Sequence, residues 1–183
     1  MPSKVLYTSM PDVGSGLLRL PVEPGAYGLF LSLQQAVKLQ VGRLGMAEFA
    51  SGMYAYLGSA GAPGGLRARL GRHLTGAGRQ HWHVDYLRAE AEIGGYVYIT
   101  TTGLSDKEQS LPIECLWSQA LAILPGASIP MVGFGASDCN CGCPAHLIYL
   151  PPKLVLAELP QKISLLRYNE DTLRICDSAL VRV

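Results

Sequence analysis

Residues 25–33, GAYGLFLSL, and residues 53–60, MYAYLGSA, decide the fold. Both stretches are short and apolar, and glycine or proline residues lie next to them, which is typical of buried β-strands. Each stretch has a tyrosine close to a glycine, Tyr27 in the first and Tyr56 in the second. The run between them, 36–41, alternates apolar and polar residues. We expect this run to pair with the first strand, which predicts a three-stranded meander.

An arginine-rich helix is predicted directly after the second of these strands. Leu66, Leu70 and Leu74 recur every four residues and form one apolar helix face. The basic side chains of the same segment, LRARLGRH, must then point away from the core. A short Gly/Pro loop, GAPGG, separates this helix from the strand before it.

Strands and helices continue to alternate in the second half of the chain. The pattern predicts a strand over 95–103, a helix with a wide apolar stripe over 113–124, and a strand over 147–150. The fold class is therefore α/β, with a small mixed or antiparallel sheet flanked by helices. The predicted organisation is a loose leader over 1–16, one domain over 17–150 and a C-terminal β-hairpin extension over 151–183.

Composition restricts the classes of function. The formal net charge is +1, so the chain is no generic polycationic nucleic-acid binder, and basic contacts must be local. The start of the chain lacks the pattern of a signal peptide, and no apolar run is long enough to span a bilayer. The five cysteines, an odd number, argue against a secreted disulfide framework. We expect a cytoplasmic protein without a membrane partner.

Four motifs carry chemistry when they are taken in order: GAY at 25–27, YLG at 56–58, LRARLGRH at 66–73, and Glu114 at the start of a later helix. In this order they resemble the GIY-YIG nuclease superfamily. The blocks YLGSAGAPGGL, HWHVDYL and GFGASDCNC resemble an uncharacterised archaeal and bacterial branch of that superfamily, whose members are sometimes fused to an endonuclease III-type repair enzyme. The connection between the two tyrosine motifs is longer here than is usual in the superfamily.

The resemblance implies the GIY-YIG fold and a divalent-metal-dependent endonuclease that hydrolyses DNA phosphodiester bonds, with branched or damaged DNA in repair as its substrate and a repair enzyme as a partner. The catalytic residues that it implies are Tyr27, Tyr56, Arg69, His73 and Glu114. Glu114 would hold Mg²⁺ or Mn²⁺, since Mg²⁺ accepts one carboxylate together with waters and phosphate. Tyr27 would activate water, and the planar fork of Arg69 suits a phosphate oxygen.

Basic residues around the helix and beyond it are expected to contact DNA. They are Arg67, Arg72, Arg79, His81 and His83. On a strand, His81 and His83 would lie on one face, where Asp85 could orient one imidazole. A hydrogen-bonded structural pair of histidines is the alternative. The turn that contains Gly135 and Asp138 is expected to close the domain near the active face.

Three alternatives stay open at this point. A nucleic-acid-binding module without catalysis would explain the near-zero net charge. A structural or assembly protein would use the cysteine loop and the tail as an interface, with a homo-oligomer as one result. The cluster Cys139, Cys141, Cys143 and His146 holds either structural zinc or free thiols, because its C-x-C-x-C spacing differs from the usual C-x2-C pair.

Overall fold

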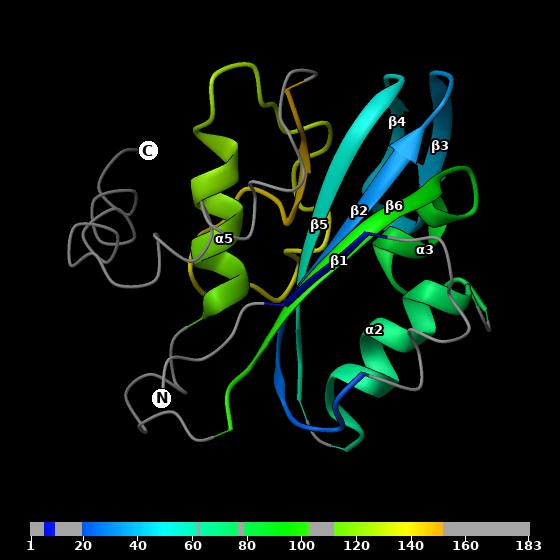
Figure 1. The fold of residues 1–183 in the computed structure, drawn as a ribbon. Coiled ribbons are helices and arrows are strands. Elements are labelled where there is room, and N and C mark those ends of the chain that lie inside the picture. The colour runs from blue at the N-terminus through cyan, green and yellow to red at the C-terminus, as the bar shows by residue number, and fades with distance from the viewer. Residues whose placement is uncertain (1–5, 10–19, 62, 77–78, 103–111, 152–183) are drawn as a thin grey trace.

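A five-stranded antiparallel sheet forms the centre of the protein (Figure 1). The computed structural model describes residues 6–9, 20–61, 63–76, 79–102 and 112–151. The strand order across the sheet is β1, β6, β2, β5, β7. These strands are β1 (Leu6–Ser9), β2 (Gly25–Leu33), β5 (Gly52–Ala60), β6 (Glu92–Thr100) and β7 (Leu147–Tyr149).

Helices cover both faces of this sheet. Helices α2 (Gly65–Thr75) and α3 (His83–Arg88) lie on one face, and α5 (Ile113–Ala122) lies on the other (Figure 1). The predicted helix face of Leu66, Leu70 and Leu74 is confirmed, because all three side chains are buried in the core under α2. The result is a helix–sheet–helix arrangement with two separate apolar cores.

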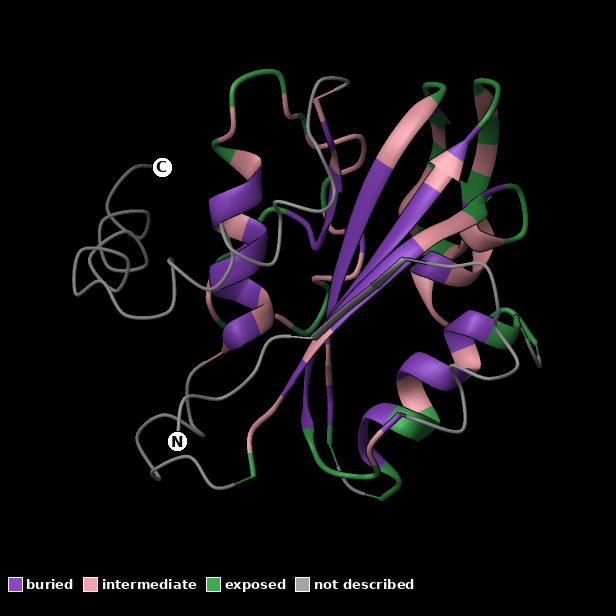
Figure 2. Cartoon of the chain, viewed as in Figure 1, coloured by how far each residue is buried: buried purple, intermediate pink, exposed green. Residues whose placement is uncertain are grey.

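Strand β2 supplies both cores, which explains its unbroken apolar sequence. Tyr27, Leu29 and Leu31 belong to the core beneath α2, whereas Ala26 and Phe30 belong to the core beneath α5. Side chains of a strand alternate between its faces, so a central strand between two helical layers must be apolar at every position. Figure 2 shows this strand as continuously buried over most of its length.

The predicted three-stranded meander is wrong. Strand β3 (Val37–Val41) pairs with β4 (Gly45–Phe49) in a separate two-stranded sheet, and β2 pairs directly with β5. A 3-10 turn, Gly42–Leu44, joins the two strands of this hairpin. The alternation in 37–41 is real, but it reflects a hairpin with one face turned to solvent. The long connection between the tyrosine motifs is therefore an inserted hairpin.

Other predicted elements are confirmed with shifted ends. The strand predicted over 95–103 is β6, the helix over 113–124 is α5, and the strand over 147–150 is β7. Residues 6–9, expected to be part of a loose leader, instead form the edge strand β1, which pairs with β6. The C-terminal hairpin predicted over 151–183 lies almost wholly outside the described residues. Within the described ranges, every helix is too short or too polar to cross a bilayer.

Candidate functional site

A pocket opens at the edge of the sheet, beyond the first residue of β7, Leu147. Strand β7 pairs with β5 only from Tyr54 to Tyr56, so the following residues of β5 have no strand beyond them. Tyr56, Arg69 and Glu114 line this pocket of about 240 Å³, together with Cys115 and Asp138. We call it the edge pocket. Because it lies at the sheet edge, residues from helices on opposite faces of the sheet can meet there.

Arg69 comes from α2, which the Leu66–Leu70–Leu74 face holds against the sheet. Its guanidinium carbon lies 4.0 Å from the centre of the Trp82 ring, a cation–π contact. Its Nε is buried and has no hydrogen-bond partner. No carboxylate of the described residues forms an ion pair with it. A buried donor without a partner is costly, so this guanidinium is suited to receive an anionic ligand.

Glu114 stands in the first turn of α5, as predicted, and is partly exposed to the edge pocket. The loop before β7 brings Asp138 and Asn140 to the same pocket. This agrees with the expectation that the turn around Gly135 and Asp138 closes the domain beside the site. Gly135 has a positive φ of 74°, and a Cβ there would lie 2.7 Å from the Tyr56 ring, so glycine is required at this position.

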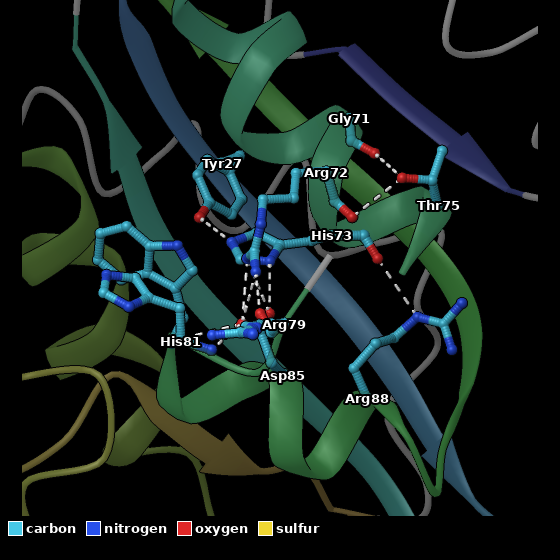
Figure 3. Close-up of polar contacts among 10 residues, drawn as sticks. Tyr27, Gly71, Arg72, His73, Thr75, Arg79, His81, Asp85 and Arg88 are labelled. Atoms are coloured by element: carbon cyan, nitrogen blue, oxygen red, sulfur yellow. Dashed lines mark hydrogen bonds and ion pairs between the residues drawn. The ribbon is translucent and has the colours of Figure 1, made fainter. Parts of the chain in front are cut away.

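Three polar side chains, Tyr27, His73 and Asp85, lie in a row (Figure 3). The Oη of Tyr27 lies 3.1 Å from Nε2 of His73, and Nδ1 of His73 lies 3.4 Å from Oδ1 of Asp85. We call Tyr27, His73 and Asp85 the polar triad. Tyr27 and His73 are buried, and Tyr27 lines neither the edge pocket nor the groove described below. The Tyr27 hydroxyl lies directly beneath Gly58, a residue of the pocket wall.

Burial sets the protonation of these groups. It lowers the pKa of His73 to about 4, against the opposing effect of Asp85, so the imidazole is neutral at neutral pH. Burial also raises the pKa of Tyr56 to about 12, against the opposing effect of Arg69, and raises that of Tyr27 well above its usual value. Both tyrosines are therefore protonated hydrogen-bond donors at neutral pH. The neutral imidazole of His73 places Nε2 at the Tyr27 hydroxyl and Nδ1 toward Asp85, and Nδ1 makes no hydrogen bond among the described residues.

Asp85 organises α3 and α2 together. Burial alone would raise its pKa, but hydrogen bonds from the backbone N–H groups of His81 and Trp82, together with Arg72, lower it. Arg72 donates to both carboxylate oxygens at 3.0–3.1 Å. The expectation that Asp85 orients an imidazole of His81 or His83 is corrected here. From His81 the carboxylate accepts the backbone N–H, not an imidazole hydrogen bond, and the imidazole beside Asp85 is that of His73.

The other predicted DNA-contacting residues fall into two groups. Arg67, Arg72 and Arg79 line neither the edge pocket nor the groove beside it. Arg67 donates to the Leu20 carbonyl at 2.7 Å, and Arg72 is held by Asp85 and by the Arg79 carbonyl. The structure does not bring these three arginines to the candidate site.

His81 and His83 lie beside the site. They line a groove of about 400 Å³ with Arg43 and Trp82, and this groove shares Tyr56 and Arg69 with the edge pocket. We call it the histidine groove. The strand expected around these histidines is wrong, because α3 begins at His83 and Trp82 precedes it in extended conformation. His83 accepts a hydrogen bond from the Gly135 backbone at Nδ1, which links α3 to the loop before β7.

The cysteine cluster adjoins the edge pocket, and its membership differs from the sequence expectation. Sulfur or nitrogen atoms of Cys115, Cys139, Cys143 and His146 all lie within 4.8 Å of one another. Cys115, from α5, was missed because it stands among buried apolar residues of the helix stripe. Hydrogen bonds from Cys115, His146 and Gln119 lower the pKa of Cys143, although burial opposes them.

The fold and the pocket define an α/β protein with an antiparallel sheet. Arg69 and Glu114 line the same pocket at the edge of this sheet. The chain belongs to the family described as DUF123, a domain of unknown function, whose sequence profile matches residues 26–167. No curated protein and no solved structure matches the chain.

Proposed function

We propose that this protein is a divalent-metal-dependent endonuclease that cleaves DNA phosphodiester bonds at the edge pocket. The observation that carries the proposal is that Tyr56, Arg69 and Glu114 line one pocket although they come from three different elements. The sequence motifs resembling the GIY-YIG superfamily single out these same residues. Branched or damaged DNA is the substrate that the resemblance favours.

Arg69 would bind the phosphate that is cleaved. Its guanidinium is held in place by Trp82 and by burial, and its Nε has no partner. A fixed planar fork binds two phosphate oxygens at once, and such charge-assisted hydrogen bonds are about twice as strong as neutral ones. Positioned charge of this kind stabilises the extra negative charge of a phosphodiester transition state.

Glu114 would hold the metal. Hard oxygen ligands suit Mg²⁺ and Mn²⁺, and the edge pocket offers the carboxylates of Glu114 and Asp138 and the side chain of Asn140. Mg²⁺ fits such a set because it keeps several waters and needs only one or two carboxylates beside the substrate phosphate. When bound, the ion would polarise the phosphate and lower the pKa of a bound water.

The two motif tyrosines would have different roles at this site. Tyr56, protonated at neutral pH, can donate to a phosphate oxygen or a water in the pocket. The Oη of Tyr27 lies 3.1 Å from Nε2 of His73 and packs against Gly58, which lines the pocket. A water-activating role for Tyr27 requires its hydroxyl to reach the pocket, and the variant Tyr27→Phe tests that role directly.

The histidine groove would receive the DNA strand next to the cleaved bond. It continues from the edge pocket through their shared residues Tyr56 and Arg69. It combines the Trp82 ring with the basic side chain of Arg43 and the imidazoles of His81 and His83. Aromatic faces and basic groups side by side are the usual means of binding single-stranded nucleic acid.

Cleavage of a labelled DNA panel tests the proposal: single strand, duplex, flap, fork and four-way junction, with Mg²⁺ or Mn²⁺. We expect metal-dependent cleavage of at least one substrate, complete loss in Glu114→Ala, and a fall of about 100-fold or more in Arg69→Lys. Arg67→Lys is the matched control, because Arg67 lies on the same helix outside both pockets, and it should retain full activity.

The alternative is a binding module on the same fold that has no catalysis. The net charge of +1 and the full burial of the Tyr27 hydroxyl favour it. If no substrate is cleaved while wild type and Glu114→Ala bind DNA equally well, the enzyme proposal is wrong and the module is correct.

A further inference from the structure

Three thiols and an imidazole converge beside the edge pocket, from a helix and a loop far apart in sequence. Cys115 belongs to α5, and Cys139, Cys143 and His146 belong to the loop before β7. Three of the four are buried, with 3, 8 and 6% of Cys115, Cys143 and His146 exposed. None of the four described cysteines forms a disulfide.

The distances match those of a tetrahedral zinc site. The sulfur atoms of Cys115 and Cys139 are 3.5 Å apart, and the Cys115 sulfur lies 3.6 Å from Nε2 of His146. Zinc bonds of about 2.3 Å to sulfur and about 2.0–2.1 Å to nitrogen place neighbouring ligands roughly 3.8 and 3.6 Å apart in a tetrahedron. The widest pair, within 4.8 Å, needs only a small inward movement.

The backbone places these ligands without help from an ion. The Gly133 N–H donates to the Pro144 carbonyl at 2.7 Å, and the His146 N–H donates to the Phe134 carbonyl at 2.8 Å. The Ser118 hydroxyl donates to the Ala145 carbonyl at 2.6 Å, which ties the loop to α5. A preformed, partly closed set of soft ligands is what a structural zinc ion requires.

We propose that Cys115, Cys139, Cys143 and His146 bind one zinc ion in a closed Cys3His site, and that Cys141 is not a ligand. The pair Cys139 and Cys143 then has the C-x3-C spacing, which lies within the usual range for zinc. The unusual C-x-C-x-C run is thus a C-x3-C pair with an extra thiol between. A long-range ligand from α5 completes the site.

Gln119 supports the assignment by a hydrogen bond to one of the proposed ligands, Cys143. Its amide Nε2 lies 3.5 Å from the Cys143 sulfur and donates to it. Donors to a thiolate spread its negative charge and orient the ligand, and they are a regular feature of metal sites.

The ion would also fix the start of α5. Cys115 directly follows Glu114, and Cys115, Cys139 and His146 all contribute to the wall of the edge pocket. Zinc would therefore hold Glu114 at a constant distance from the loop that carries Asp138. This consequence for Glu114 rests on the proposed function, whereas the zinc site itself does not.

Metal content of the full chain, purified from zinc-supplemented cells, tests the site. We expect about one zinc per chain in wild type, with an X-ray absorption spectrum of three sulfur and one nitrogen or oxygen ligands. Cys115→Ser and Cys143→Ser should lose the ion or bind it at least roughly 100-fold more weakly. Cys141→Ser and Glu114→Ala are matched controls that should keep it.

Three outcomes would overturn the proposal. One is folded wild-type protein without zinc that also fails to take up Zn²⁺ or Co²⁺. Another is loss of the ion in Cys141→Ser, which would show that the ligand set is wrong. The third is a Cys115–Cys139 disulfide in freshly purified protein. If a serine variant fails to fold, the wild-type absorption spectrum still decides the number and type of ligand atoms, and Cys141→Ser tests whether Cys141 is among them. Zinc is measured without any cleavage assay, so failure of the nuclease proposal leaves this result intact.

Discussion

At the level of single residues, the tightest constraint near the pocket is the contact between Gly58 and Tyr27. The two residues face each other across β5 and β2. A Cβ at Gly58 would lie 2.5 Å from the Tyr27 hydroxyl oxygen and 2.6 Å from the ring carbon that carries it. The glycine of the YLG motif is therefore required by the tyrosine of the GAY motif, independently of any catalytic role.

The variant Gly58→Ala should be destabilised by about 1–3 kcal/mol, because the rigid buried ring cannot move away from an added methyl group. Urea unfolding followed by circular dichroism measures this. Gly61→Ala is the control, since a Cβ there meets nothing within 4 Å. Equal stability of the two variants would show that the Tyr27 ring is not held against β5.

His73 predicts a particular dependence of stability on pH. Its pKa is about 4 in the folded protein, below the ordinary value of 6.5. The unfolded chain therefore binds the proton more readily, and stability is lost as pH falls from about 6.5 to about 4, by up to roughly 3 kcal/mol.

The measurement is the free energy of unfolding of wild type and His73→Gln between pH 7.5 and 5. The wild type should lose stability more steeply than the variant, which has no imidazole at this position. The Asp85 carboxyl titrates below this window, since its pKa is lowered, and so does not confuse the comparison. Parallel curves for the two proteins would contradict a buried neutral imidazole.

At the level of elements, α3 depends on one carboxylate. Asp85 accepts from the N–H groups of His81 and Trp82 at 2.8 and 2.9 Å, which caps the helix start. The same carboxylate holds Arg72 of α2. One side chain therefore joins α2, which carries Arg69, to the start of α3, which Trp82 directly precedes.

The variant Asp85→Ala should lose about 2–4 kcal/mol of stability, because it removes the cap and leaves Arg72 without its partner in a half-buried place. Glu48→Ala is the control. The Lys38–Glu48 pair has a distance of 3.7 Å and is mostly exposed, so its loss should cost less than about 1 kcal/mol. Thermal unfolding of both variants measures the difference. Similar losses would mean that Asp85 is no more than a surface charge.

Local patterns in the sequence predict α2 and α5 from an apolar helical period, and β2 and β5 from short apolar runs next to glycine or proline. They fail for β3, because alternation shows that a strand has one exposed face but does not identify its partner. They fail again around Trp82, because a six-residue helix has too few turns for a periodic signal.

The residues of the candidate site were also predictable only where local sequence patterns carry them. Tyr56, Arg69 and Glu114 could be singled out from motif order, and the structure places them around one pocket. The contributions of Cys115, Asp85 and Trp82 could not, since each depends on where α5 or α3 lies relative to α2 and the sheet. Long-range packing of this kind leaves no trace in local spacing.

At the level of the whole molecule, stability is expected to be uneven. Strand β2 pairs with neighbours on both sides and is buried, whereas the β3–β4 hairpin forms its own two-stranded sheet with several exposed side chains. Two-stranded sheets are only marginally stable by themselves.

Native-state hydrogen exchange should therefore separate the two regions. Hydrogen-bonded amides of β2 should exchange only through global unfolding, and those of β3 and β4 should exchange through local opening at least about 100-fold faster. Nuclear magnetic resonance of the protein in heavy water resolves the individual amides. If the hairpin is protected as strongly as β2, it belongs to the same cooperative unit as the main sheet.

Because β2 is buried on both faces, the position of each residue along the strand decides which core its side chain enters. Odd-numbered residues from Tyr27 to Leu33 serve one core and even-numbered residues such as Phe30 serve the other. Insertion or deletion of one residue within the strand would exchange the two sets and misdirect both cores at once. The turn at 42–44 lacks this constraint, because it joins two strands of a separate sheet. Changes of chain length are therefore expected to accumulate there and to be absent from the strand that carries Tyr27.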